Sequence, residues 1–322
     1  MLFSDVCFTR YEHNPIIAPK DFAAGAMATM NCGQTMYNGK TILLVSVLYR
    51  NRTKPAIHVA ESEDGIHFTI RPEPFITRSK LPHVTPLDGW VIDPRVTYFA
   101  EDNCYYIMRP GNSPVGCVAI LGKTTDFETY EDIDIIAMPN NRVPCLFPEK
   151  IDGYYVRFDR PYSLASSLSG GPWHGNIWLS YSPDLIHWGR HRLALTPWGN
   201  WSGTKIGPTP PIKTDKGWLE IIHGVTTDCS GSRYSLGAAM FDLKDPSKCI
   251  GKVGGPVLTP DAPYEYQGRT PNVLFSCGCI ADYDKDRLRM YYSACDTSIC
   301  LATGKLSELV DLCLQNDFAE EV

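Results

Sequence analysis

The sequence of 322 residues predicts an all-β protein, a five-bladed β-propeller, because three kinds of segment recur along the chain in phase. In the first, a turn-rich stretch runs into an apolar strand that ends on a charged or imidazole side chain. Its five copies end at Arg50, Arg109, Arg160, His223 and Asp296. Consecutive ends are 59, 51, 63 and 73 residues apart. Hairpins that repeat at about sixty residues are typical of propeller blades.

A second motif follows each hairpin and repeats at a similar interval. Small and apolar residues alternate, a turn with Asp or Ser follows, and many copies then carry an aromatic residue, as expected for strand, turn and strand. Four copies are marked by Asp64, Asp126, Asp184 and Asp242, at intervals of 62, 58 and 58 residues. We therefore expect outer strands within 57–68, 117–130, 177–189, 235–249 and 299–309.

A third kind of segment precedes each hairpin and is predicted to form the innermost strand of a blade. These segments start with polar residues and often contain proline, which is tolerated at the start of a strand. They begin at Asn31, Asp93, Arg142, Lys205 and Arg269. Only residues 307–315 favour a helix. Pro and Gly, 51 residues together, are spread along the chain, so we expect one catalytic domain over residues 1–322.

The bulk composition excludes several classes of protein. A net charge of −6 without a basic stripe argues against nucleic-acid binding. The sequence contains no run of eighteen apolar residues, so we expect no membrane span. Its first residues lack the pattern of a signal peptide. Most of the 12 cysteines lie in strand-like segments without a CxxC pair. We therefore expect reduced thiols, a cytoplasmic protein and no structural metal.

Equivalent strand ends of a propeller surround one axis, so residues far apart in sequence should converge there. The expected group comprises Asn31, Asp93, Arg95, Arg142 and Lys205 from inner strands, with Arg50, Arg109, Arg160, His223 and Asp296 from second strands. Cations outnumber carboxylates in it. A glycosidase normally needs two carboxylates beside the scissile bond, and Asp93 is the one strong candidate, with Asp296 the second and Asp159 and Asp228 weaker.

Several guanidinium groups, a lysine and a histidine instead suit inorganic phosphate, whose oxygens arginine binds bidentately. Phosphate would then replace the missing base and its water as the nucleophile. Structural alternatives stay open for single residues. Arg95 would pair with a nearby acid, Arg109 would be an exposed loop residue, and His223 would be a hydrogen-bonded core histidine.

The order of short motifs along the chain resembles glycoside hydrolase family 130, which contains β-mannoside phosphorylases and β-1,2-mannosidases. The motifs include Tyr49-Arg50, Asp93-Pro94-Arg95, Phe147-Pro148-Glu149-Lys150, Arg160-Pro161, Lys205-Ile206-Gly207, His223-Gly224-Val225, Tyr234-Ser235 and Asp296-Thr297. Each motif alone is short, whereas their joint order covers nearly the whole chain. The resemblance implies a five-bladed propeller, in agreement with the repeats.

The resemblance also implies roles for individual residues. Asp93 would be the single catalytic acid, protonating the glycosidic oxygen through a hydroxyl of the bound mannose. Phosphate would be bound by Arg142, Arg160, Lys205, His223 and Tyr234. Substrate would be bound by Asn31, Arg50 and Asp296. We add Arg95 and Arg109 to this set because the repeats also place them near the axis. The expected partners are a β-mannoside and inorganic phosphate, and members of the family are commonly homo-oligomers.

We therefore expect an inverting β-mannoside phosphorylase that forms α-mannose 1-phosphate and a shortened sugar. Two positions depart from relatives: Val143 follows Arg142, where many members that act on β-1,4 linkages carry Asn, and Ile92 precedes Asp93, where many relatives carry Tyr or Glu. They favour a β-1,2-linked mannoside and leave β-1,4 open. The alternatives are a hydrolase of the same fold and a non-catalytic sugar-binding propeller.

Overall fold

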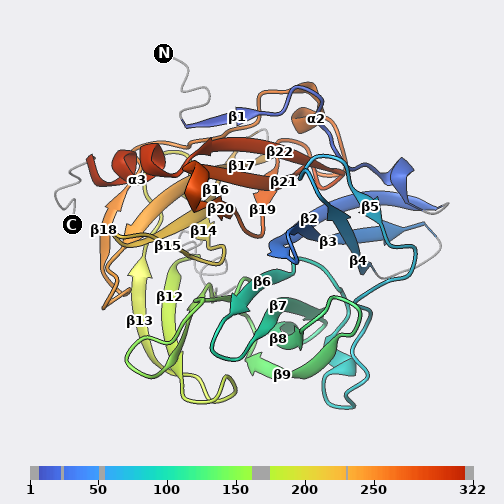
Figure 1. Ribbon diagram of the computed structural model, residues 1–322, viewed down its shortest axis with the longest axis horizontal. Helices are drawn as coiled ribbons and strands as arrows, with labels where there is room; N and C mark the ends of the chain where they lie inside the picture. Colours follow the sequence, from blue (N-terminus) through green and yellow to red (C-terminus); the bar gives the residue numbers. More distant parts are fainter. Residues whose placement is uncertain (1–6, 23–24, 51–54, 162–174, 230, 316–322) are drawn as a thin grey trace.

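Five antiparallel sheets surround a central axis in the computed structural model, which describes residues 7–22, 25–50, 55–161, 175–229 and 231–315 (Figure 1). Blade 1 contains β2 (Ala26–Tyr37), β3 (Lys40–Tyr49), β4 (Ala56–Ser62) and β5 (Thr69–Ile70). Blade 2 contains β6 (Arg95–Phe99), β7 (Cys104–Ser113), β8 (Gly116–Thr124) and β9 (Glu131–Ala137). Blade 3 contains β10 (Cys145–Leu146), β11 (Tyr155–Asp159), β12 (Ile177–Ser182) and β13 (Gly189–Leu195). The predicted five-bladed propeller is confirmed.

The last two blades each carry a fifth strand. Blade 4 contains β14 (Lys205–Gly207), β15 (Ile212–Lys213), β16 (Trp218–Asp228), β17 (Gly231–Phe241) and β18 (Cys249–Lys252). Blade 5 contains β19 (Leu274–Ser276), β20 (Ile280–Asp282), β21 (Arg287–Ala294), β22 (Ser298–Lys305) and β1 (Phe8–Arg10). Short 3-10 turns occupy Pro19–Asp21, Thr85–Leu87 and Tyr283–Lys285.

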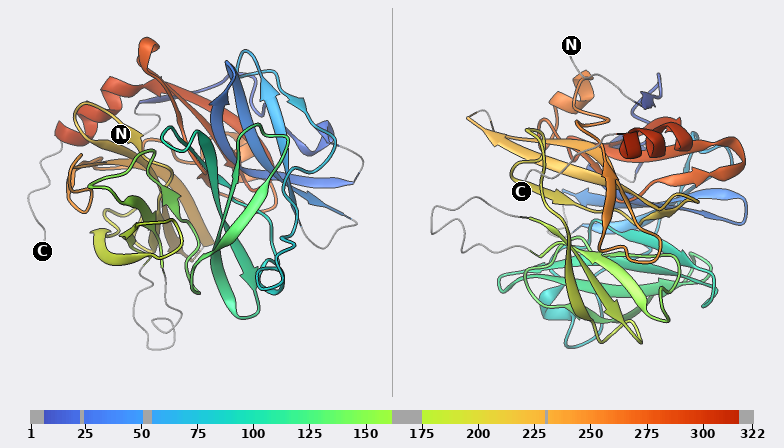
Figure 2. Two further views of the ribbon diagram at one scale, coloured as in Figure 1. Left: turned by 60° about the horizontal axis from the view of Figure 1, so that its bottom comes forward. Right: turned by 90° about the vertical axis from the view of Figure 1, so that its left-hand side faces the viewer.

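Within the described ranges, two helices lie at the rim of the ring (Figure 1). The predicted C-terminal helix is α3 (Leu306–Gln315), and the short α2 (Pro263–Tyr266) was not anticipated. Helix α3 buries Leu309, Val310 and Cys313 and packs against β17, β18 and β22, as the views in Figures 1 and 2 show. No helix in the described ranges is long and apolar enough to cross a membrane.

Turn residues in the hairpins explain why the repeats were visible in sequence. Asn38-Gly39 joins β2 to β3 and Asp152-Gly153 precedes β11, and all four residues have positive φ, between 48° and 79°. Two-residue hairpin turns need positive φ at both positions, which Asn-Gly and Asp-Gly adopt most readily. The outer-strand aspartates act differently: Asp64 and Asp184 accept backbone N–H groups in the turns after β4 and β12.

The core lies between adjacent blades because alternate residues of a strand face opposite neighbours. In β7, Ile107 packs in a cluster with residues of blade 1, whereas Met108 packs with residues of blade 3. Between blades 3 and 4, the rings of Phe147 and Trp218 lie 5.1 Å apart. Burying each such side chain contributes about 1.5–3 kcal/mol, so every blade depends on both of its neighbours.

The ring is closed by the N-terminal strand, which sequence analysis did not predict. Strand β1 pairs with β22, so Phe8 lies opposite Gly304 and Arg10 opposite Ala302. Arg10 then reaches α2, where its Nε lies 2.9 Å from Oε1 of the fully buried Glu265. The last blade is thus built from both ends of the described chain.

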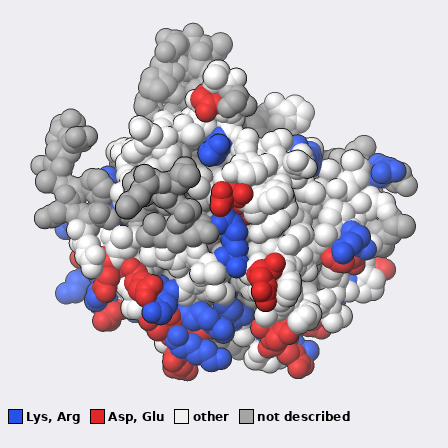
Figure 3. Space-filling view, turned by 90° about the horizontal axis from the view of Figure 1, so that it is seen from above, with Lys and Arg blue, Asp and Glu red and all other residues white. Residues whose placement is uncertain are grey.

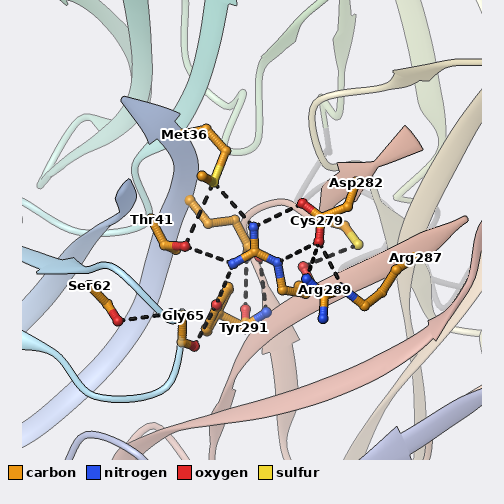
Figure 4. Close-up of polar contacts among 10 residues, drawn as sticks. Met36, Thr41, Ser62, Gly65, Cys279, Asp282, Arg287, Arg289 and Tyr291 are labelled. Carbon is orange, nitrogen blue, oxygen red and sulfur yellow. Dashed lines mark hydrogen bonds and ion pairs between the residues drawn. The ribbon is translucent and has the colours of Figure 1, made fainter. Parts of the chain in front are cut away.

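A second polar contact joins blade 5 to blade 1, centred on Arg289 of β21 (Figure 4). Its Nη1 donates to Thr41 Oγ1 of β3 at 2.7 Å, and its Nε and Nη2 bind the carboxylate of Asp282. Tyr291 of β21 donates to the carbonyl of Gly65, in the turn after β4, at 2.7 Å. These bonds fix the first and last blades relative to each other.

Charge on the outside is mixed in sign. On the face seen in Figure 3, acidic and basic side chains are interspersed among uncharged ones. This agrees with the small net charge of −6 and gives that face no broad basic field of the kind that attracts nucleic acid.

Candidate active site

Asp93 lies in the segment that leads from blade 1 into β6, and it is 2% exposed. Asn31 Nδ2 of β2 donates to Asp93 Oδ1 at 2.7 Å, and Arg142 Nη2 lies 3.9 Å from Oδ2. The backbone is held as well: the N–H donates to Ser46 Oγ at 3.2 Å, and the carbonyl accepts from Arg95 Nη1 at 2.9 Å. Blades 1, 2 and 3 therefore meet at this carboxylate.

Three polar residues near the axis adopt the left-handed conformation. Asn31, Asp93 and Asp296 have φ of 45°, 54° and 50°. Asn and Asp tolerate this region better than other non-glycine residues, yet each such residue costs of order 1–3 kcal/mol and persists only where its surroundings enforce it. Asn31 sits in a β-bulge, because the pairing of β2 with β3 jumps from Met30–Ser46 to Gly33–Leu44. A bulge re-aims side chains, and here it turns Asn31 toward Asp93.

Blades 3 and 4 contribute the positive charges, which we call the cationic group: Arg142, Arg160 and Lys205. Arg142 precedes β10, Arg160 directly follows β11 and is 3% exposed, and Lys205 begins β14. Burial, together with the charges of Arg160 and Arg142, lowers the pKa of Lys205 to about 7. A Cβ added at Gly175 would lie within 3.4 Å of both Lys205 and Arg160, so these two side chains are neighbours, and Arg142 lies beside Asp93.

His223 and Tyr234 lie beside the cationic group on neighbouring strands of blade 4. Their rings are stacked with centroids 6.1 Å apart, and Lys205 Nζ lies 5.3 Å from the Tyr234 ring centroid. Burial first, then Arg160, Arg95, Lys205 and Arg142, holds the pKa of His223 well below its usual value, so its imidazole is neutral. The imidazole packs directly on the Cα of Gly207, where no larger residue would fit.

Asp296 completes the ring of polar residues from blade 5. It follows β21, and its Oδ2 accepts the hydroxyl of Thr270 at 2.7 Å. Burial raises the pKa of Asp296, and the negative charge of Asp93 adds to that rise. The two carboxylates therefore interact electrostatically. The polar residues around Asp93 come from all five blades.

Arg95 is placed below this group rather than at its mouth. It is 1% exposed, its Cζ lies 5.7 Å from the ring centroid of Phe275, and that ring in turn lies 4.6 Å from His223. Nε and Nη2 of Arg95 have no hydrogen-bond partner among the described residues. Arg95 therefore holds the backbone of Asp93 and packs on Phe275, which in turn contacts His223.

One predicted substrate-binding arginine, Arg109, is not brought into this group. Arg109 is fully buried, and its Nη1 and Nη2 bind the carboxylate of Asp88 at 2.7 and 2.8 Å, so it is neither an exposed loop residue nor directed to the axis. Arg109 lies within β7, which continues to Ser113, and its guanidinium is held on the side of the strand where Asp88 lies. Arg50 follows β3 and is exposed, and its backbone N–H donates to Gly25.

Three residues at the site were not predicted from the sequence: Ser46, Thr270 and Phe275. Thr270 and Phe275 gave no signal, because their roles depend on contacts with other blades. Ser46 did give one: it is the single polar residue between Ile42 and Leu48 in a strand whose neighbours are buried. A polar residue in a buried strand requires a hydrogen-bond partner.

A separate cavity of about 1130 Å³ opens between blades 2 and 3. It is lined by the end of β9 and by Trp178, Trp188 and His191. It meets the cationic group through Asn141, whose Oδ1 accepts the backbone N–H of Arg160 at 3.2 Å. The cavity is thus next to the site around Asp93 but does not contain it.

One buried acid faced by cations, on a propeller of five blades, defines a carbohydrate-active protein equipped to hold an anion beside the acid. The family model described as beta-1,4-mannooligosaccharide phosphorylase matches residues 12–315. The chain therefore belongs to glycoside hydrolase family 130, as the motifs predicted.

Curated relatives cover nearly the whole chain. The β-1,4-mannooligosaccharide phosphorylase of Ruminococcus albus is 34% identical over 312 residues, 94% of this chain and 89% of its own. The β-1,2-mannobiose phosphorylase of Listeria innocua is 32% identical over 362 residues, 94% of this chain and 97% of its own. The solved structure of that enzyme from Listeria innocua with β-1,2-mannobiose has a TM-score of 0.84 at 30% identity, covering 95% of this chain and 99% of that one.

Proposed function

We propose that this protein is an inverting β-mannoside phosphorylase, a glycosyltransferase-type enzyme that transfers a mannosyl group to inorganic phosphate. The observation that carries the proposal is the placement of Arg142, Arg160 and Lys205 opposite one buried acid, Asp93. A neutral sugar and a water nucleophile need no such concentration of positive charge. A phosphate dianion does, and burial strengthens each of its charge-assisted hydrogen bonds.

In the proposed mechanism a phosphate oxygen attacks the anomeric carbon from the side opposite the leaving sugar. The glycosidic C–O bond breaks, and the leaving oxygen takes a proton supplied by Asp93 through a hydroxyl of the mannose. The products are α-mannose 1-phosphate and the shortened sugar. Phosphate is bound by Arg142, Arg160, Lys205, His223 and Tyr234.

Asn31 is proposed to bind the mannose directly. Its Nδ2 is engaged with Asp93, whereas its buried Oδ1 has no hydrogen-bond partner among the described residues. A buried acceptor without a partner is costly and is suited to a hydroxyl of the substrate. Asp296, whose Oδ2 is already engaged with Thr270, is proposed to line the same sugar site, with Arg50 at its exposed edge.

The neutral state of His223 fits this arrangement. A neutral imidazole has one N–H donor and one acceptor, and its buried Nδ1 has no hydrogen-bond partner among the described residues. A phosphate OH or oxygen would satisfy one of the ring nitrogens without adding a fourth positive charge.

We propose a β-1,2-linked mannoside as the first substrate to test and a β-1,4-linked one as the alternative. Val143 and Ile92 support the first, and the relatives named above include enzymes for both linkages. We further propose a single catalytic domain over residues 1–322 that works in the cytoplasm and that, like many relatives, assembles with copies of itself. Twelve free thiols are suited to a reducing compartment. Phosphate is the proposed co-substrate, without a metal or organic cofactor.

The test is a panel of β-1,2- and β-1,4-mannobiose and mannosyl-glucose, incubated with and without phosphate. We expect α-mannose 1-phosphate to appear only when phosphate is present. Release of free mannose at the same rate in phosphate-free buffer would identify a hydrolase instead. Binding of the sugars without turnover in either buffer would identify a sugar-binding propeller.

A further inference from the structure

The hydroxyl of Ser46 connects the two residues that present the catalytic acid. Ser46 lies in the middle of β3 and is fully buried. Its Oγ donates to the carbonyl of Asn31 at 3.1 Å and accepts the backbone N–H of Asp93 at 3.2 Å. One hydroxyl of β3 thus links the bulge in β2 to the segment that enters blade 2.

The bulge explains why a side chain is needed at this point. Ser46 pairs with Met30, and the next pairing is Gly33 with Leu44, so Asn31 is left outside the regular ladder. A bulge leaves the extra residue without its ladder hydrogen bonds, and buried backbone groups require other partners. The hydroxyl of Ser46 supplies the partner for the Asn31 carbonyl.

The same hydroxyl fixes the backbone of Asp93. Both Asn31 and Asp93 are held at positive φ, a conformation that a non-glycine residue keeps only under constraint. Between their side chains runs the 2.7 Å hydrogen bond from Asn31 Nδ2 to Asp93 Oδ1. The backbone link through Ser46 and the side-chain link through the amide close one loop of hydrogen bonds around the acid.

We propose that Ser46 is a positioning residue for the proposed reaction: its hydroxyl holds Asn31 and Asp93 in the left-handed conformations that aim the acid at the substrate. The inference rests on the proposed function, because it takes Asp93 as the acid. Packing alone does not call for a hydroxyl here. The flanking Val45 and Val47 are fully buried, and an alanine or valine would fit the pattern of β3 equally well.

Loss of the Ser46 hydroxyl should affect kcat, which depends on the acid, and not the KM for phosphate. Among the described residues, the Ser46 hydroxyl contacts the backbones of Asn31 and Asp93 and none of the proposed phosphate ligands. Loss of the hydroxyl frees the acid from its productive geometry, and a misplacement near 1 Å costs on the order of 10²-fold in rate. Ser46→Ala should therefore lower kcat by about that factor and leave the KM for phosphate unchanged.

The experiment compares Ser46→Ala, Ser46→Thr and Asp93→Asn in the phosphorolysis assay. Ser46→Thr keeps a hydroxyl and should retain most of the wild-type kcat. Ser62→Ala is the matched control, because Ser62 is a buried serine of blade 1 whose hydroxyl serves only the turn at Asp64 and Gly65 among the described residues. It should lower the melting temperature without lowering kcat.

The outcomes distinguish this inference from the proposed function. Wild-type turnover of Asp93→Asn would refute Asp93 as the acid and with it the role of Ser46, whereas absence of phosphate-dependent turnover in the unmodified protein would refute the proposed function. An inactive Asp93→Asn beside a fully active Ser46→Ala overturns the role of Ser46 alone, as does an equal loss in the alanine and threonine variants. Should Ser46→Ala not fold, Ser46→Cys replaces it, since a thiol has the shape of the hydroxyl but is a weak donor. Equal kcat of the cysteine and threonine variants then overturns the inference.

Discussion

Lys205 shows how the environment of one residue sets the behaviour of the site. Its ammonium is buried beside Arg160 and Arg142, which lowers its pKa to about 7 from the ordinary value near 10.5. The group is therefore charged below pH 7 and progressively neutral above it in the free protein. Phosphate brings negative charge to this position, so it binds best to the protonated form.

We expect the KM for phosphate to rise with pH. If the phosphate dianion requires protonated Lys205, the KM expressed as dianion concentration should increase by roughly fivefold between pH 7 and pH 8, because the protonated fraction falls by that factor around a pKa near 7. The measurement is the phosphate dependence of the initial rate across this range. Lys205→Arg is the control, because a guanidinium stays charged throughout. The same slope in both proteins would contradict the assignment of the titration to Lys205.

The repeats predicted most of the residues that surround Asp93. Asn31, Asp93, Arg142, Arg160, Lys205, His223 and Asp296 were grouped correctly on that basis. Arg109 was expected at the end of its strand and near the axis, but β7 continues to Ser113 and the guanidinium of Arg109 binds Asp88. Ser46 was missed because its importance lies in a bulge, and a bulge depends on the register between two strands, which the composition of either strand does not specify.

At the scale of elements, the closing strand β1 depends on a buried ion pair. Arg10 Nε and Nη2 lie 2.9 Å from the two carboxylate oxygens of Glu265. The carboxylate also accepts the hydroxyl of Tyr292 and the N–H groups of Asp261 and Ala262. It therefore organises α2, β21 and β1 at one point.

Removing one partner of this pair should be more damaging than removing both. Arg10→Met leaves the Glu265 carboxylate buried without its cation, which typically costs 3–5 kcal/mol of unfolding free energy. Arg10→Met with Glu265→Gln should recover part of the loss, because no charge then stays buried. Urea unfolding of the two variants measures the difference. Lys305→Ala, which breaks an exposed pair with Glu308, is the control and should change little. A double variant no more stable than Arg10→Met would argue against the ion pair as the cause.

The boundaries of the elements were less predictable than their order. The segment beginning at Arg142 was expected to be an inner strand, yet its regular part is reduced to Cys145–Leu146. The residues before Cys145 do not form part of the strand, and in this irregular stretch Arg142 faces Asp93. Strand β1 gave no signal, since three residues pair with β22 almost three hundred positions away.

At the scale of the whole molecule, the site exists only when the ring is assembled. Asp93 belongs to blade 2, Arg142 and Arg160 to blade 3, Lys205 and His223 to blade 4, with Asn31 from blade 1 and Asp296 from blade 5. Five repeats predicted this convergence, because a ring brings equivalent positions of every repeat to one axis. The repeats did not predict that β1 closes the ring, because that strand is not part of any repeat.

Phosphate should therefore stabilise the folded ring as a whole. A ligand that binds the folded state alone contributes about 2.7 kcal/mol at a hundredfold excess over its Kd. Because the proposed ligands lie on blades 3 and 4 and face an acid on blade 2, this energy opposes separation of the blades. The melting temperature should rise with phosphate concentration and should not rise with chloride at the same ionic strength, which screens charge without occupying the site. Arg142→Ala should lose the phosphate effect and keep the chloride response, whereas equal shifts with both salts would mean that the cationic group does not bind phosphate specifically.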